Sequence, residues 1–402
     1  MSQEHEIDLV LATAGGPVDW SEIPASFPVS EARSLEDAFN RMAEDLAPSL
    51  GADQIVVRFC QSTGIGARLH PCAPGRYVIT LPIGLFVRMY AVGRRLWAYR
   101  DRERKGINPK TILQFATSPA DDYDPDALIV PDRVRSIFGE YKTDREFWPQ
   151  LVEFDAGNEH AEKTDFNVSI LVNQALVLVY AHELGHLALG HVAFAKEVLA
   201  VTSPDPLAEV KRLVRKGLEL EADYFAGPQL AGLCYLDIER NGRLDSSDDW
   251  AADFFRIGFS LVMLFGAFDP RKRSLGVYDR EFYAHPIVRH QAVRHSISAF
   301  FSQVGALQEL WRKSSVMGWI EAEQCIAWFT LLECMDGASA ESLIPIHALV
   351  HGGEASSPYI SAKLRHGQAL FEATQRVRQR FVDGRFSLGD LEEFVPLLES
   401  SV

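Results

Sequence analysis

The spacing of apolar positions changes along the chain and predicts a small sheet followed by a mostly helical remainder. Three short segments separated by glycine and proline occupy residues 54–82, in the stretches QIVVRFCQ, GARLHPC and RYVITLP. β-Branched residues in such short runs are typical of strands, so we predict a small antiparallel sheet over residues 54–82. The next segment, IGLFVRMYAVGRRLWAYRDRERKG, has helical periodicity and ends in a charged tail.

The longest apolar segment with helical character covers residues 165–194, and we predict that this helix forms the centre of the molecule. The stretch VTSPDP breaks the pattern, helical periodicity returns over residues 207–235, and the chain after Trp250 is mostly helical. The predicted class is therefore α+β and mostly helical. We divide the chain into an N-terminal α/β region (1–150), a central region (151–300) and a helical C-terminal region (301–402).

The stretch HELGH within the long apolar helix places His182 and His186 one turn apart on the same face, so both imidazoles can reach one metal ion. Glu183 is rotated by about 100° from His182, and its carboxylate can take a proton from metal-bound water. This H-E-x-x-H arrangement is typical of zinc metalloproteases, so we predict Zn2+ as the cofactor. The alternative is a helix that carries these three polar groups without using them, which burial would make costly.

A catalytic zinc ion needs a third protein ligand, and the stretch GLELEADYFAG offers Glu219, Glu221 and Asp223. Glu219 and Asp223 share one helix face, so the first can bind the metal while the second orients a ligand histidine. Glu221 points the other way. The upstream apolar residues as far as Leu218 share a face with Glu221, whereas those from Ala222 onward share a face with Glu219. Periodicity therefore leaves both glutamates open as the metal ligand.

HELGH followed by ELEADYFA resembles the gluzincin pattern of the CaaX-protease and HtpX-like peptidases, in which a distal E-x-x-x-D follows H-E-x-x-H. The resemblance implies a zincin-like fold with an active-site helix. It also implies that His182, His186 and Glu219 bind zinc and that Glu183 is the general base. On this basis we prefer Glu219 to Glu221 as the third ligand.

A later stretch, YAHPIVRHQAV, is similar to the H-P-x-x-x-x-R segment of the same family, with His285 and Pro286 matching. The resemblance makes His285 a candidate donor to the oxyanion of the tetrahedral intermediate. The arginine of the family pattern falls at Gln291, and Arg289 and Arg294 lie nearby. Members of the family usually carry membrane-spanning helices, so the resemblance here implies a soluble form.

Two other groups of H-E-x-x-H proteins help to place the motif. The phage-exclusion Lit peptidases are a second and looser resemblance. The metzincin pattern does not fit, because its glycine and its third histidine would fall at Leu189 and Val192. His191 is shifted by one position from that pattern, and we expect it to cap the end of the helix or to line the rim of the site.

Charge and cysteine content restrict the class of partner. The chain has 402 residues and a formal net charge of −15, which argues against nucleic acid and anionic membranes as partners. Its most apolar runs are shorter than the roughly 20 residues that span a bilayer, so we expect no membrane span. The five cysteines form no C-x-x-C pair, and the acidic N-terminus does not match a signal peptide. We therefore expect a cytoplasmic protein without a disulfide framework.

The predicted function is zinc-dependent hydrolysis of peptide bonds in a specific intracellular protein. The segment GRYVITLP is either an exposed edge strand that binds an extended substrate, as in zincins, or an interior strand. Two other functions compete with this prediction. One is a catalytically silent interaction protein with a zincin fold, and the intact Glu183 counts against it. The other is a metal-dependent hydrolase of a small molecule, which a closed pocket would favour.

Overall fold

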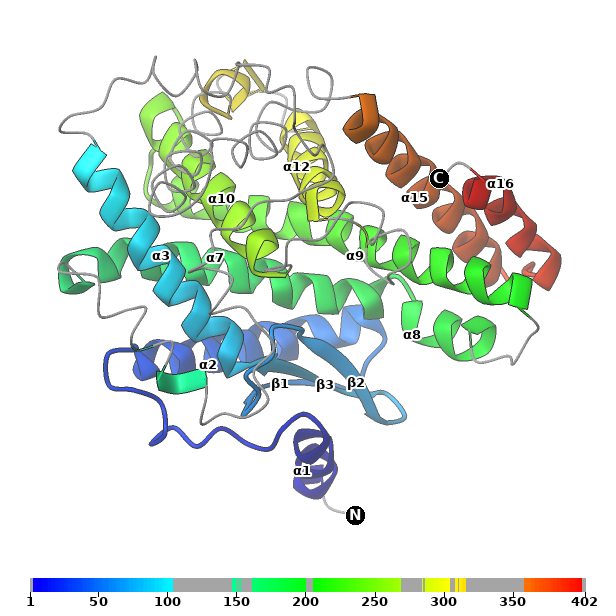
Figure 1. Ribbon diagram of the computed structural model, residues 1–402, viewed down its shortest axis with the longest axis horizontal. Helices are drawn as coiled ribbons and strands as arrows, with labels where there is room; N and C mark the ends of the chain where they lie inside the picture. The colour runs from blue at the N-terminus through cyan, green and yellow to red at the C-terminus, as the bar shows by residue number, and fades with distance from the viewer. Residues whose placement is uncertain are drawn as a thin grey trace, which may run out of the picture.

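The computed structural model shows a mostly helical protein with one small sheet, in agreement with the predicted α+β class (Figure 1). The structure describes residues 3–103, 147–149, 152, 161–199, 205–268, 284, 286–303, 308–309, 311–315 and 358–399. The strands are β1 (Gln54–Cys60), β2 (Arg68–Ala73) and β3 (Arg76–Pro82). The helices are α1 (Gln3–Thr13), α2 (Val29–Leu46), η1 (Ala47–Leu50), α3 (Ile83–Glu103), α7 (Ala161–Ala188), α8 (His191–Phe194), η2 (Ala195–Leu199), α9 (Asp205–Arg240), α10 (Ser247–Phe268), α12 (Pro286–Gln303), α15 (Pro358–Val382), η5 (Leu388–Phe394) and α16 (Val395–Glu399).

The three strands form a mixed sheet in the order β1-β3-β2. β2 and β3 are joined by a tight turn and pair antiparallel, with Leu69 opposite Ile79. β1 pairs parallel to β3, with Val57 opposite Ile79, so the prediction of an antiparallel sheet was wrong for this pair. The reason is that β3 inserts between β1 and β2 instead of following β2 at the edge. The segment GRYVITLP is therefore the interior strand.

Helix α2 covers the outer edge of β1 with side-chain hydrogen bonds. Nδ2 of Asn40 donates to the carbonyl oxygen of Val57, and Oδ1 of Asn40 accepts from the N–H of Val57, each at 2.9 Å. The Glu36 carboxylate accepts a hydrogen bond of 2.6 Å from the N–H of Phe59. These bonds satisfy backbone groups that an edge strand would otherwise leave unpaired. The edge of the sheet at β1 is therefore covered by α2.

The central helix ends earlier than its apolar pattern predicts. α7 stops at Ala188, and α8 begins only at His191. Gly190 between them has φ of 72°, in the left-handed region that glycine adopts without strain, and this conformation ends the helix. The prediction of one helix up to Phe194 was wrong for this reason. The turn redirects the chain, and His191 becomes buried in the protein.

Helix α7 lies at the centre of the molecule, where it packs against α3, α9 and α10 (Figure 1). One apolar cluster extends in sequence from Ile23 to Phe301 and joins the sheet to these helices and to α12. Within it, Phe39 of α2 stacks on Tyr180 of α7 with ring centroids 4.7 Å apart. A second cluster joins α8 and α9 to α15. The division into three regions stays a prediction.

The segment Phe166–Ala188 of α7 is the one stretch, among the described residues, that is long and apolar enough to cross a membrane. Its most apolar window is 72% buried inside the protein. Contacts with the surrounding helices therefore account for its composition, as in the core helix of a globular protein.

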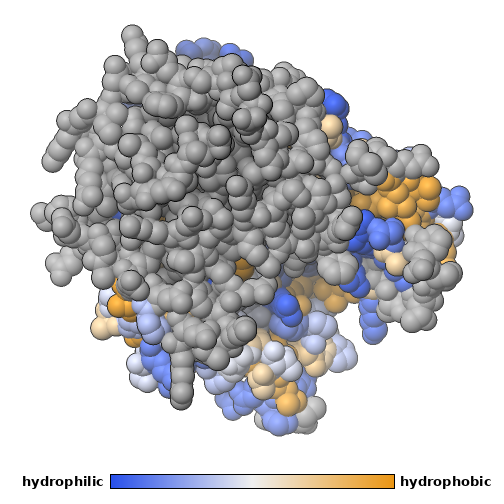
Figure 2. All heavy atoms as spheres, in the orientation of Figure 1, coloured by the Kyte–Doolittle hydropathy of each residue, from blue (hydrophilic) through white to orange (hydrophobic). Residues whose placement is uncertain are grey.

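The C-terminal helices bring apolar side chains close to the surface. Figure 2 shows hydrophobic side chains gathered at the right edge of this face, where α15 and α16 lie in Figure 1. Val382 at the end of α15 and Val395 at the start of α16 are exposed. Leu397 and Leu398 of α16 pack against the second apolar cluster. This cluster therefore continues nearly to the surface at the C-terminal helices.

We predict that Asn40→Ala lowers the free energy of unfolding by about 2 kcal/mol, because the buried N–H of Val57 loses its partner and the carbonyl oxygen of Val57 is left with the hydrogen bond from Arg58 alone. Urea denaturation followed by circular dichroism measures this change. Asn241→Ala is the control, since Asn241 is exposed and bonds only to Asp237 of its own helix and turn. Equal stability of the two variants would contradict the role given to Asn40.

Candidate metal centre

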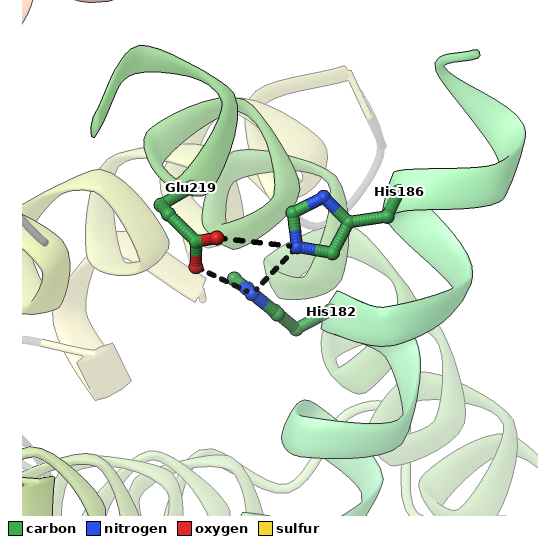
Figure 3. A group of neighbouring side chains, drawn as sticks. All are labelled: His182, His186 and Glu219. Carbon is green, nitrogen blue, oxygen red and sulfur yellow. Dashed lines mark hydrogen bonds and ion pairs between the residues drawn. The ribbon is translucent and has the colours of Figure 1, made fainter. Parts of the chain in front are cut away.

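Helices α7 and α9 bring three potential metal ligands together (Figure 3). The Nε2 atoms of His182 and His186 are 3.2 Å apart. Glu219 of α9 places its Oε2 3.2 Å from Nε2 of His182 and its Oε1 3.6 Å from Nε2 of His186. The three side chains thus converge on one point from two helices.

The spacing of these atoms fits a tetrahedral metal ion. Ligand atoms about 2.1 Å from such an ion lie about 3.4 Å from one another, and the measured distances run from 3.2 to 3.6 Å. Two imidazoles and one carboxylate form a donor set that catalytic zinc sites use, with the fourth position open to water. Of the two glutamates that periodicity left open, Glu219 is the one that the structure brings to the histidines.

Gly185 allows α7 and α9 to approach closely enough for this grouping. It lies between the two histidines in sequence and faces Ala222 and Phe225 of α9. A Cβ atom at this position would lie 3.2 Å from Cα of Ala222 and 3.1 Å from Cδ1 of Phe225. Favourable carbon–carbon contacts are about 3.5–4.0 Å. Any side chain at residue 185 would therefore push apart the two helices that carry the ligands.

Asp223 lies behind His182, one turn after Glu219 on α9. Its Oδ1 is 2.9 Å from Nδ1 of His182, which leaves Nε2 of the ring directed at Glu219. Arg289 of α12 donates two hydrogen bonds to Asp223, from Nε to Oδ2 at 2.7 Å and from Nη2 to Oδ1 at 2.8 Å. A carboxylate in this position orients a metal-binding histidine and fixes its tautomer. Arg289, one of the two arginines near the expected family position, therefore contacts the group behind His182.

Glu183 is buried beside the sheet. The backbone N–H of Leu69 on β2 lies near enough to favour the charged form of its carboxylate. Burial raises the pKa of Glu183 to about 7, although the positive charge of His182 opposes the shift. A general base is most effective when its pKa lies near the working pH. Glu183 can therefore accept and return a proton near neutral pH.

The electrostatics of the three ligands differ from one another. Burial lowers the pKa of His186 to about 3, so this ring is neutral. Burial also lowers the pKa of His182, but the charges of Asp223 and Glu219 outweigh it and raise the value to about 10. Burial raises the pKa of Glu219, but its hydrogen bond with His182 and the nearby positive charges outweigh that effect and lower it to about 2. The carboxylates around His182 would equally favour a metal cation at its Nε2.

Glu221 contacts His191 and Arg378 instead of the potential ligands. Its Oε2 is 3.1 Å from Nε2 of His191, and Nε of Arg378 donates to both of its oxygens at 3.0 and 3.1 Å. Nδ1 of His191 lies 2.9 Å from Nδ1 of His186. His191 was expected to cap the helix or to line the rim, and it is instead buried behind His186.

Sequence reasoning missed Arg378 and misplaced His191. Arg378 lies 157 residues after Glu221, and no pattern near it points to a metal centre. His191 carried a signal, since it follows His186 by five residues in HELGHLALGH. The candidate catalytic residue His285 lies outside the described residues, and α12 begins at the next position, Pro286.

Comparisons of the chain with models of known protein families, with curated proteins and with solved structures found no match. The resemblance to the CaaX-protease and HtpX-like peptidases therefore stays a prediction from the quoted motifs. The grouping of His182, His186 and Glu219 is argued from its own geometry.

We predict that Gly185→Ala weakens both the fold and the metal centre. The added Cβ must displace the backbone of Ala222, which shifts Glu219 away from the histidines. Gly232→Ala on α9 is the matched control, because a Cβ there meets only Phe300 at an ordinary 3.8 Å. The control should gain up to about 1 kcal/mol from helix propensity. Thermal unfolding and zinc titration of both variants test this, and equal behaviour would refute it.

Proposed function

We propose that the protein is a zinc-dependent peptidase whose metal centre is formed by His182, His186 and Glu219. The observation that carries the proposal is the convergence of these ligands at tetrahedral spacing, with Glu183 next to the first of them in the chain. The buried contact between Asp223 and His182 adds support, because it orients a ligand in the way known from zinc sites. The motif and the geometry therefore favour the same chemistry.

Each residue has a defined role in this proposal. When bound, zinc would polarise the substrate carbonyl and acidify a water molecule. Glu183 takes a proton from the water as the water oxygen attacks the carbonyl carbon. Glu183 then gives this proton to the leaving amine as the C–N bond breaks. Asp223 and Arg289 hold His182 in place. His285 stays a candidate donor to the oxyanion.

Strand β2 is the part of the sheet that can present an extended substrate to Glu183. β3 lies inside the sheet and α2 covers β1, whereas β2 is an edge strand next to α7. β2 contacts α7, the helix that carries Glu183, and the N–H of Leu69 on β2 favours the charged form of that carboxylate. An extended peptide that pairs with β2 would bring its backbone next to the metal centre. This supports a peptide as substrate. We further propose, from composition alone, that the substrate is a specific intracellular protein of the cytoplasm.

The buried Glu183 favours an enzyme over a catalytically silent protein. A structural metal site has no use for a carboxylate that is buried at 6% exposure and held at a pKa near 7. Zinc bound without hydrolysis of any peptide would favour the silent interaction protein. Hydrolysis of small amides or esters alone would favour the small-molecule hydrolase.

We predict one zinc ion per chain in the wild type and the loss of stoichiometric zinc in His186→Ala and Glu219→Ala. Each variant removes one of three protein ligands, and affinity falls steeply with each ligand lost. Glu209→Ala is the control on α9, because Glu209 is exposed and pairs with Arg212. Elemental analysis after zinc loading and desalting gives the result. Full occupancy in either ligand variant would show that the metal is bound elsewhere.

We predict that Glu183→Gln keeps zinc but loses hydrolysis by at least about 100-fold, because the amide cannot accept the proton of the attacking water. A peptide library read by mass spectrometry, with unfolded casein beside it, supplies the activity measurement. Glu197→Gln serves as control, since Glu197 is exposed on the neighbouring η2 helix. Undiminished cleavage by Glu183→Gln would remove this residue from the mechanism.

A further inference from the structure

A chain of buried contacts links His186 to helix α15, far away in the sequence. Nδ1 of His186 is 2.9 Å from Nδ1 of His191, and Nε2 of His191 is 3.1 Å from Oε2 of Glu221. Arg378 of α15 then donates from Nε to both oxygens of Glu221. His191 and Glu221 are buried, and the side chain of Arg378 is only 12% exposed. Such a set of polar groups is stable in the interior only when each group has a partner.

The order of the partners determines where the protons lie. Arg378 is always charged and donates only, so the Glu221 carboxylate accepts from it and also from His191. His191 must then carry its proton on Nε2, which leaves Nδ1 as an acceptor. His186 can donate to that acceptor only from a protonated Nδ1, and its Nε2 keeps a free lone pair. That lone pair faces His182 and Glu219, at the point where a metal would bind.

Helix α15 is held against this part of α9 at two successive turns. In the first, Gly217 lies so close to Thr374 that a Cβ atom at residue 217 would overlap the threonine hydroxyl. In the second, four residues later on both helices, Glu221 meets Arg378. Nη1 of Arg378 also donates to the carbonyl oxygen of Leu189 at 3.3 Å, directly after α7. One side chain of α15 thus contacts α9 and the residue that follows α7.

We infer that α15 is a working part of the metal centre, in which Arg378 and Glu221 hold His191 so that it fixes the metal-binding tautomer of His186. Arg378, Glu221 and His191 are positioning residues and do not bind the metal themselves. Helix α15 would thus support the metal centre, a role that its sequence does not reveal. This role rests on the metal centre of the proposed function but not on peptidase activity, so zinc affinity is the quantity to measure.

The first experiment compares Arg378→Met with Arg376→Met in the full-length protein. Arg376 is on the same helix, but its side chain is 56% exposed and pairs with Glu393. Zinc affinity is measured by competition with a chelator of known affinity. We expect at least about tenfold weaker binding for Arg378→Met, as for other residues that orient metal ligands, and no change for Arg376→Met. Arg378→Lys should fall between them, because lysine keeps the charge but not the forked contact.

A second pair of variants separates positioning from general destabilisation. His191→Phe keeps a ring but offers no acceptor to His186, whereas His191→Asn keeps an oxygen near the position of Nδ1. Zinc affinity should fall at least about tenfold in the first variant and recover in large part in the second. The visible spectrum of the cobalt-substituted protein should differ from that of the wild type more in His191→Phe than in His191→Asn. Val377→Ala, a buried apolar residue of α15, should lower the thermal midpoint without altering affinity or spectrum.

The possible results distinguish the two proposals. A wild type that binds zinc, together with unchanged affinity and cobalt spectrum in Arg378→Met, Arg378→Lys and both His191 variants, would overturn the role of α15 and leave the metal centre intact. A wild type that binds no zinc would overturn both. Should Arg378→Met fail to fold, Arg378→Lys and His191→Asn are milder substitutions that still give a measurable affinity, and wild-type affinity in both would contradict the inference.

Discussion

The close approach of α7 and α9 at Gly185 is the constraint on which the rest of the site depends. Two helices that carry bulky residues at their contact are usually 8–10 Å apart, and here a glycine faces the backbone of Ala222. The short distance lets a glutamate of one helix reach two histidines of the other. Glu183, two residues before Gly185 on α7, is buried as well. The chemistry of the site therefore follows from one small residue at a helix crossing.

Burial on this scale makes polar groups without partners costly, and the structure places charged partners beside the two histidines in two separate sets. Asp223 and Arg289 sit behind His182, and Glu221 and Arg378 sit behind His191, which contacts His186. In each set a carboxylate faces an imidazole and an arginine faces the carboxylate. The arginines come from α12 and α15, so helices remote in sequence complete the centre. Helix α7 on its own would leave its buried polar groups without partners, at a cost of several kcal/mol.

The sequence predicted the parts of the fold that local periodicity controls. The strand segments were placed within about two residues, and the existence of the long apolar helix and of α9 was predicted with less accurate ends. Pairing that depends on tertiary contacts was not predictable in the same way, since β3 inserts between two strands that precede it in the chain. The end of α7 was missed because Gly190 lies within an apolar pattern that continues to Phe194. A glycine at positive φ interrupts a helix without changing that pattern.

The candidate site was likewise predictable from the sequence only where local periodicity determines the position of a residue. HELGH predicted the positions of two candidate ligands and of the candidate base, because residues four apart on a helix share a face. Periodicity could not choose between Glu219 and Glu221, since both lie on α9 and each shares a face with some apolar residues. The structure distinguishes them by their contacts: Glu219 lies beside His182 and His186, whereas Glu221 pairs with Arg378. The partner of Glu221 lies on α15 and had no signal in the sequence.

The central claim is that His182, His186 and Glu219 form one tetrahedral zinc centre. X-ray absorption spectroscopy at the zinc edge of the loaded wild-type protein tests it most directly. The account predicts about four nitrogen and oxygen neighbours near 2.0–2.1 Å, with the outer-shell scattering of two imidazoles and no sulfur. A sulfur neighbour near 2.3 Å, or a spectrum without imidazole scattering, would place the metal at other residues and contradict the account.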